Sequence, residues 1–320
     1  MQGLKKIATR ESYGRALVEL GKKHGNLIVL DADLAEATKT NIFRKEFPAR
    51  HIDCGIAEAN MMGIAAGLSL TGKVPFASTF AMFAAGRAYE QVRNTIGYPH
   101  LNVKIAATHA GISVGEDGAS HQCLEDLALM RMIPGMTVMC PADDVEARAM
   151  VEAAYTYEGP VYMRLGRLAV PPVNEVESYR FTWGRGIKLR EGKEVAVFAT
   201  GLMVAPVLAA AEKITTELGL GVSVANIHTI KPLDDDLILD MVKDAKLIVT
   251  AEEHSILGGL GGAVAEFLSE RLPKRMLRIG IRDVFGESGP AVELLQRYGL
   301  DAAGVHNQIC SALKNNEKSC

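Results

Sequence analysis

The chain has 320 residues, of which 48% are hydrophobic and 23% are charged, and its formal net charge at pH 7 is −3. This composition is typical of a soluble globular enzyme, and the length predicts two domains. The charge balance argues against nucleic-acid binding, and the long apolar runs are interrupted by Gly, Lys or acidic residues, so no membrane span is predicted.

Strand-like and helix-like segments alternate through the first half of the chain. The apolar runs predict strands at 27–31, 51–55, 74–78, 103–108, 136–140 and 161–165. The segments between them predict helices at 57–70, 83–96, 123–131 and 143–157. Such alternation implies right-handed βαβ units and a mainly parallel sheet that is covered on both faces.

The alternation stops near residues 169–175, which hold two prolines, and the polar stretch that follows has no periodicity. A second series then predicts strands at 194–201, 222–228, 246–253 and 275–282, with helices at 203–217, 233–243 and 261–272. The sequence therefore predicts an α/β fold of two domains, each a mainly parallel sheet flanked by helices. We expect the domains at 1–172 and 193–320, with a linker at 173–192.

The cysteines indicate a reducing environment. They are odd in number, widely spaced and without a CxxC pair, which argues against a zinc cluster or a disulfide framework. They are Cys54, Cys123, Cys140, Cys310 and Cys320. The first ten residues lack the apolar stretch of a secretion signal, so a cytoplasmic protein is expected.

Candidate functional residues follow the predicted strands of the first domain. In open parallel sheets, ligands bind beyond the carboxyl ends of the strands. The residues found there are Asp33, Glu58, Phe80, Phe83 and His109. Their common position predicts that they lie at one site.

The segment from His109 to His121 is the most unusual in the chain, because it also holds Glu116 and Asp117 among glycines. Histidine titrates near neutral pH, so two histidines in one loop suit proton transfer or contact with an oxyanion. The alternatives are a solvated connection with incidental histidines and a metal site, although no short ligand spacing supports a metal. We favour the catalytic interpretation, because loops carry many functional sites.

Each of the other candidate residues has a functional and a structural interpretation. Glu58 opens a helix that is almost wholly apolar, where it could cap the helix or, with a pKa raised by burial, share a proton with a basic heterocycle. Phe80 and Phe83 could stack on a planar ligand or belong to the core. The arginines Arg10, Arg164 and Arg167 could hold a phosphate, although each alone is more often a surface ion pair.

Several motifs, taken together, resemble the thiamine-diphosphate-dependent transketolase family, specifically its C-terminal half. They are IATR (7–10), ADLA (32–35), DCGIAEANM around Glu58, STF.MF (78–83), TH (108–109), GEDG.SHQ (115–122) and FGES.P..ELL (285–295). The resemblance covers nearly the whole chain in order. It implies a pyrimidine-binding domain followed by a transketolase C-terminal domain.

The resemblance implies roles around the cofactor. Glu58 corresponds to the catalytic glutamate that binds N1′ of the aminopyrimidine and promotes its imino tautomer. A buried carboxylate suits that role, because water does not compete for the proton. Phe80 and Phe83 correspond to the wall that stacks on the pyrimidine, and Asp33 and Leu34 to residues that approach the thiazolium and the sugar hydroxyls.

The resemblance also implies roles around the substrate. His109 and His121 correspond to catalytic histidines near the carbonyl and first hydroxyl of the donor, and Asp117 to the acid that recognises the C2 hydroxyl. Arg10 and Arg164 correspond to the arginines that hold the sugar phosphate.

Two positions depart from the family pattern. The phosphate pocket usually has a serine where this chain has Ala37, with Thr38 adjacent as a candidate substitute. One aromatic position of the pyrimidine wall is Gly86. These two positions therefore bear on the affinity for phosphate and on the thickness of the aromatic stack.

Full-length family members also carry an N-terminal domain with a GDG…N motif that binds Mg²⁺ and the diphosphate, and nothing here matches it. Met1 lies only nine residues before Arg10. We therefore expect a split transketolase of the pentose phosphate pathway, which transfers a two-carbon ketol unit from a ketose phosphate to an aldose phosphate. A separate N-terminal subunit would supply the ligands of Mg²⁺, the assembly would be a heterotetramer, and this chain alone would be inactive.

Three other hypotheses remain at this stage. EEHSILGGLGG (252–262) and TIKPLD (229–234) resemble 1-deoxy-D-xylulose-5-phosphate synthase and the β subunits of 2-oxoacid dehydrogenases, whereas TH, GEDG.SHQ and FGES favour transketolase. A non-catalytic assembly subunit would be expected to lack Glu58 or the histidines. A dinucleotide-binding dehydrogenase is disfavoured, because Val264 stands where the glycine fingerprint requires Gly.

Overall fold

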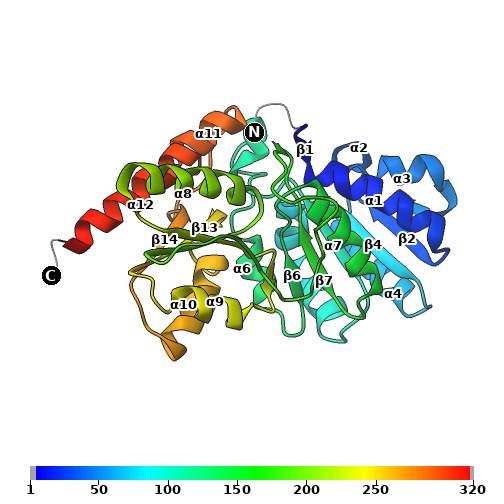
Figure 1. Ribbon diagram of the computed structural model, residues 1–320. Helices are drawn as coiled ribbons and strands as arrows, with labels where there is room; N and C mark the ends of the chain where they lie inside the picture. The colour runs from blue at the N-terminus through cyan, green and yellow to red at the C-terminus, as the bar shows by residue number, and fades with distance from the viewer. Residues whose placement is uncertain (1–4, 318–320) are drawn as a thin grey trace.

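The structure is a computed structural model that describes residues 5–317, and its strands form two main sheets side by side, each enclosed by helices (Figure 1). The strands of the first half are β1 Ile7–Ala8, β2 Leu27–Asp31, β3 His51–Asp53, β4 Val74–Phe80, β5 Lys104–Thr108, β6 Thr137–Met139, β7 Val161–Arg164 and β8 Ala169–Val170. Its α-helices are α1 Thr9–Lys23, α2 Ala35–Thr38, α3 Asn41–Glu46, α4 Glu58–Ser69, α5 Tyr89–Gln91, α6 Asp126–Arg131 and α7 Asp144–Thr156.

The second half continues the alternation. Its strands are β9 Ile187–Arg190, β10 Val195–Ala199, β11 Val222–Asn226, β12 Thr229–Lys231, β13 Leu247–Ser255 and β14 Met276–Ile281. Its α-helices are α8 Val204–Leu218, α9 Asp235–Val242, α10 Leu260–Arg271, α11 Ala291–Arg297 and α12 Ala302–Glu317. Every strand predicted from the sequence is present, with ends that differ by a few residues.

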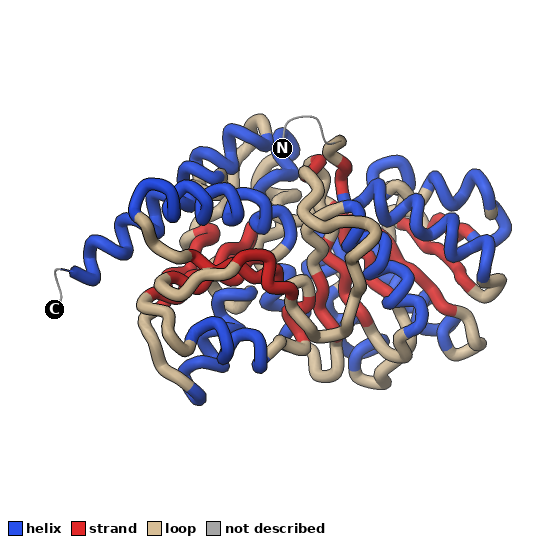
Figure 2. The backbone as a smooth tube through the Cα atoms, in the orientation of Figure 1, coloured by secondary structure: helices blue, strands red, loops and turns tan. Residues whose placement is uncertain are grey.

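The first sheet has the order β12-β6-β7-β5-β4-β2-β3 and is parallel except at β12. Figure 2 shows its strands in red, with helices in blue around them. β12 belongs to the second half of the chain but pairs with β6, with Thr229 opposite Met139. The sequence pattern predicts no strand at these residues. The second half therefore completes the edge of the first sheet, which ties the two sheets together.

The second sheet has the order β14-β13-β10-β11-β9, with only β9 antiparallel. β9 lies within 173–192, where the sequence predicts a linker, and pairs with β11 through Lys188 opposite Ala225. Its residues alternate between charged and apolar side chains, which suits an edge strand with one face in water.

Side chains of the first sheet alternate between two apolar layers, as the period of a strand requires. On β2, Leu27 and Val29 pack in the layer of α1 and α7, whereas Ile28 and Leu30 pack in the layer of α4 and α6. The central strands β2, β4 and β5 are buried throughout, which explains their nearly continuous apolar sequence.

The helix predicted at 83–96 differs in winding. Residues Phe83–Arg87 and Val92–Gly97 form π-helical turns around the short α5. The amide of Ala88 donates to the carbonyl of Phe83, five residues back, at 3.0 Å. Such wide turns occur often at functional sites, and this one follows the carboxyl end of β4.

Within the described residues, no helix is both long and apolar enough to cross a membrane.

Candidate active site

Glu58 is the first residue of α4, and its side chain is 1% exposed. The Nη1 atom of Arg87 donates to both carboxylate oxygens, Oε1 at 3.0 Å and Oε2 at 2.9 Å. The Arg87 side chain is half exposed, and its guanidinium lies 4.6 Å from the centre of the Phe83 ring. A buried carboxylate thus has a cationic partner that reaches it from the surface.

Aromatic rings line the carboxyl end of β4. The rings of Phe80 and Phe83 are nearly parallel, with centroids 5.6 Å apart and an interplanar angle of 11°. The imidazole of His109 stacks on Phe80 at 3.8 Å, and His121 meets the Phe83 ring edge-on at 5.5 Å. Phe80 is buried, whereas Phe83 is partly exposed. The structure therefore brings Phe80, Phe83 and His109 together, as their positions after the predicted strands imply, and it adds His121 to this cluster.

His109 follows β5 in a left-handed backbone conformation, with φ of 54°. Nη1 of Arg10 lies 2.9 Å from its Nε2 atom, and Thr108 Oγ1 lies 2.9 Å from its Nδ1 atom. A guanidinium can only donate, so Nε2 accepts and Nδ1 carries the proton. Burial, followed by the charges of Arg10 and Arg167, lowers the pKa of His109 to about 3, so the imidazole is neutral at physiological pH.

Two arginines stand close to each other beside this loop. Arg10 also donates from Nη1 to the carbonyl of Ala37 at 2.8 Å, and its buried Nε atom has no hydrogen-bond partner. Burial and the charge of Arg167 lower the pKa of Arg10. Arg167 donates to the carbonyl of Val114 and to Glu116 Oε2, the latter at 2.9 Å. Two guanidinium groups with unused donors suit an anion.

Arg164 does not join this pair, and its partners argue against the phosphate-binding role expected for it from the sequence. Its side chain is 5% exposed, and its Nε donates to both oxygens of Asp126, at 3.1 and 2.9 Å. Its Nη2 donates to the carbonyl of Glu253 at 2.8 Å. Arg164 is the last residue of β7 and faces the interior between the sheets, whereas Arg167 lies past the strand end, beside Arg10.

Asp33 and Leu34 lie in the turn after β2, next to a carboxylate that the sequence analysis missed. Asp31 Oδ1 accepts from the Leu34 amide at 2.5 Å, and Oδ2 accepts from the hydroxyls of Thr38 and Thr40 at 2.6 and 2.9 Å. Burial raises the pKa of Asp31 to about 6. Its place at the end of a buried strand was the signal available in the sequence.

These bonds bear on the departure at Ala37. The Thr38 side chain is fully buried, and its hydroxyl is engaged by Asp31. It is therefore not a free substitute for the serine of the family pattern, and Ala37 contributes only its carbonyl, to Arg10.

The remaining substrate candidates lie in the segment from His109 to His121. Asp117 is exposed, at the end of the 3₁₀ turn Ile112–Asp117. His121 is partly exposed, and its Nδ1 lies 3.0 Å from Ser120 Oγ. Within residues 5–317, no three His, Cys, Asp or Glu side chains come together as metal ligands would.

Both parts of the chain match known domains. Residues 5–172 match the pyrimidine-binding domain of transketolase, and residues 184–305 match the transketolase C-terminal domain. The chain belongs to the transketolase family. A protein of Methanocaldococcus jannaschii, provisionally named a transketolase C-terminal section, is 50% identical over 307 residues, which cover 95% of this chain and 96% of that protein.

Two further comparisons show which part of a transketolase this chain represents. Transketolase of Rattus norvegicus is 38% identical over 307 residues, which cover 94% of this chain but only 48% of the rat protein. A solved structure described as a split gene transketolase, in an inactive β4 tetramer, is 54% identical with a TM-score of 0.89. That match covers 96% of this chain and 99% of the solved chain. This transketolase-family chain therefore corresponds to the C-terminal half of a split transketolase.

Proposed function

We propose that this chain is the C-terminal subunit of a thiamine-diphosphate-dependent transketolase that transfers a two-carbon ketol unit from a ketose phosphate to an aldose phosphate. The observation that carries the proposal is the position of Glu58, whose carboxylate is 1% exposed and is hydrogen-bonded to Arg87. The guanidinium of Arg87 in turn lies over the ring of Phe83, which is stacked with Phe80. An apolar wall beside one buried carboxylate fits a flat heterocycle that has a basic nitrogen.

The residues present fit the pyrimidine end of the cofactor. Phe83 offers a partly exposed ring face, and Glu58 offers the carboxylate oxygens that would hold a proton shared with the N1′ atom. Gly86 supplies no ring at the third aromatic position of the family pattern, so Phe80 and Phe83 would provide the surface that stacks on the pyrimidine. When bound, thiamine diphosphate supplies the carbon nucleophile that carries the two-carbon unit.

The other site residues would handle the sugar phosphate. His109, neutral and with its proton on Nδ1, would orient the oxygens of the donor, and His121 would exchange protons with its hydroxyl groups. Asp117 would accept a hydrogen bond from a substrate hydroxyl. Arg10 and Arg167, rather than Arg164, would hold the phosphate, because their guanidinium groups flank the same loop.

The diphosphate and Mg²⁺ would be held by a separate N-terminal subunit, and the two kinds of chain would assemble as a heterotetramer. The split-gene neighbour supports this proposal, because a chain of the same extent is described there as an inactive tetramer. Function in the cytoplasm, as part of the pentose phosphate pathway, belongs to the same proposal.

The test is to purify this chain with and without its companion chain and to assay xylulose 5-phosphate with ribose 5-phosphate. Only the two-chain preparation is expected to turn over, and turnover by this chain alone would contradict the split arrangement. Glu58→Ala is expected to abolish turnover while the chains still assemble. The matched control is Glu212→Ala, which removes an exposed glutamate from α8. Near-normal activity of Glu58→Ala would refute the cofactor assignment.

A further inference from the structure

Two motifs of the second half have no role in the chemistry proposed above. They are EEH at 252–254, near the end of β13, and FGES at 285–288, between β14 and α11. Both reach the segment from His109 to His121, which we call the histidine loop. Helix α11 also packs against the 3₁₀ turn in the middle of this loop.

Glu253 makes the first attachment. Its side chain is 3% exposed, and its Oε1 atom accepts a hydrogen bond from the Ser113 amide at 2.6 Å. Gly111 has φ of 85°, and a Cβ at that position would collide with the Glu253 carboxyl group. The glycine thus gives the loop its left-handed turn and lets the carboxylate approach the backbone.

Gln122 makes the second attachment, at the opposite end of the loop. Its Nε2 atom lies 2.9 Å from the carbonyl of Glu287, and 3.2 Å from the carbonyls of both Ile112 and Gly115. One amide group therefore joins the FGES segment to the 3₁₀ turn of the loop. Gln122 follows His121 directly, so this attachment also restrains the second histidine.

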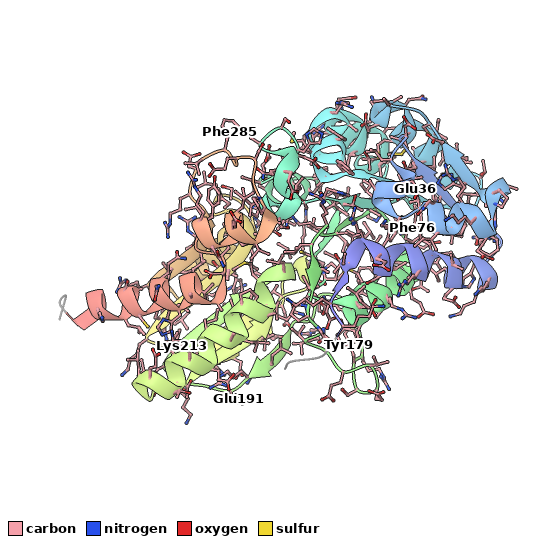
Figure 3. All side chains as sticks on the ribbon, turned by 90° about the horizontal axis from the view of Figure 1, so that it is seen from above. Glu36, Phe76, Tyr179, Glu191, Lys213 and Phe285 are labelled. Carbon is pink, nitrogen blue, oxygen red and sulfur yellow. The ribbon has the colours of Figure 1, made fainter. Side chains whose placement is uncertain are left out.

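The FGES segment is itself braced. Glu287 Oε1 accepts from Arg297 Nε at 2.7 Å and from the Tyr298 hydroxyl at 3.2 Å. The same hydroxyl lies 3.3 Å from the carbonyl of Phe285, whose side chain is 88% exposed and is labelled in Figure 3. The segment is thus held by hydrogen bonds to Arg297 and Tyr298 at the end of α11. Because the Phe285 side chain is exposed, these polar contacts, and not its burial, fix the position of the segment.

We propose that Glu253 and Gln122 are positioning residues, through which the second domain sets the geometry of the histidine loop without touching substrate. This inference rests on the proposed function, since that function gives the loop its role in substrate binding. A contact that only joined the two domains would not require a buried carboxylate that accepts a hydrogen bond from a single backbone amide. That arrangement immobilises a chosen point of the loop, three residues before Glu116.

Amide hydrogen exchange on the full chain tests the proposal. In Glu253→Ala, the amides of residues 111–118 are expected to exchange at least about tenfold faster, because a lost hydrogen bond to a buried carboxylate makes local opening easier by that order. The amides of β10 and β11 are expected to keep their rates. Unchanged exchange in the loop, or a uniform rise across the chain, would overturn the proposal.

Two further variants sharpen the result. Glu253→Gln keeps an acceptor oxygen and is expected to restore most of the protection, whereas equal loss in both variants would contradict the role of the hydrogen bond. Gln122→Leu removes the second attachment from the loop side, so it keeps the proposal testable if Glu253→Ala fails to fold. Its expected result is faster exchange at residues 115–118. Glu270→Gln, an exposed glutamate on α10, is the matched control.

The two-chain enzyme adds a second readout. Glu253→Ala is expected to raise the KM for the donor sugar as well as lower kcat, since Asp117 and His121 would lose their positions. A smaller folded fraction would lower kcat and leave KM unchanged, which would overturn the positioning role. Exchange is measured on this chain alone, so a failure of the proposed transketolase activity would leave that result standing.

Discussion

Arg10 donates a hydrogen bond from Nη1 to Nε2 of His109 at 2.9 Å, and this bond selects the tautomer of the histidine. The proton must then lie on Nδ1, where Thr108 Oγ1 is 2.9 Å away. The two residues come from α1 and from the end of β5, 99 positions apart. Arg10 can therefore bind an anion and also keep the neighbouring imidazole of His109 neutral.

Removing Arg10 should change the titration of His109. Burial is the largest cause of the lowered pKa of about 3, and the charge of Arg10 is the second. In Arg10→Met, the pKa is therefore expected to rise but to stay below 6.5, because burial remains. Titration of the imidazole by NMR, assigned with His109→Gln, measures this shift. Arg15→Met, on the exposed face of α1, is the control, and an unchanged His109 titration would contradict the prediction.

The roles of Arg164 and Arg167 can be separated by stability. Arg164→Met leaves the buried Asp126 carboxylate without its cation, which is expected to cost about 3–5 kcal/mol in the free energy of unfolding. Arg167→Met is expected to cost less than about 1 kcal/mol, because its partner Glu116 is exposed. Urea denaturation of both variants compares the two costs. Equal losses would refute the distinction.

Substitutions of Arg167 and Arg164 are also expected to differ in their effect on substrate binding. In the two-chain enzyme, Arg167→Met is expected to raise the KM for a phosphorylated acceptor by about tenfold or more and to leave the KM for the unphosphorylated sugar unchanged. The folded fraction of Arg164→Met is expected to keep the KM of the unmutated enzyme. If Arg164→Met alone raises the KM for the phosphorylated sugar, the assignment made from sequence is right and ours is wrong.

The two phenylalanines of the aromatic wall are expected to differ in how much each contributes to stability and to cofactor binding. Phe83 is partly exposed, so Phe83→Leu is expected to lose little stability and to raise the thiamine diphosphate concentration at half-maximal activity about five- to tenfold. Phe80 is buried between other rings, and Phe80→Leu is expected to be destabilising as well. Phe267→Leu, which changes a partly buried ring on α10, is the control. Equal cofactor dependence in Phe83→Leu and Phe267→Leu would contradict the stacking role.

Glu146 on α7 predicts a pH dependence of stability. Its carboxylate accepts from Asn226 Nδ2, from the Ala142 amide and from the hydroxyl of Tyr179, which is labelled in Figure 3. Burial raises the pKa of Glu146 from 4.5 to about 7. The folded chain therefore binds a proton that the unfolded chain has lost, and the contribution of Glu146 to stability falls as the pH rises from 4.5 to 7.

The fall attributable to this residue is on the order of 3 kcal/mol. Glu146→Gln cannot ionise, so its free energy of unfolding is expected to depend less on pH in this interval. Urea denaturation at pH 5, 6, 7 and 8 measures both curves, and the difference between them isolates Glu146 from Asp31, whose raised pKa acts in the same direction. Parallel curves for the two proteins would show that Glu146 does not titrate in this range.

Much of the site was predictable because parallel strands impose a common edge. Glu58, Phe80, Phe83 and His109 each follow a predicted strand, and the carboxyl ends of such strands meet. The choice between Arg164 and Arg167 was not predictable in this way. Both are basic and three residues apart, and only the packing of the second sheet against the end of β7 decides which one is buried.

The sequence by itself determined the alternation of strands and helices, the two-sheet α/β plan and the family, because these follow from local periodicity and from contiguous motifs. Tertiary structure alone decided which distant groups meet. Glu253 reaches Ser113 across 140 positions, and Gln122 reaches Glu287 across 165. No local pattern encodes such contacts, since they depend on how the second domain packs against the first. The size and charge of the chain allow two domains, and the folded structure shows that residues of the second domain bond to the segment from His109 to His121 of the first.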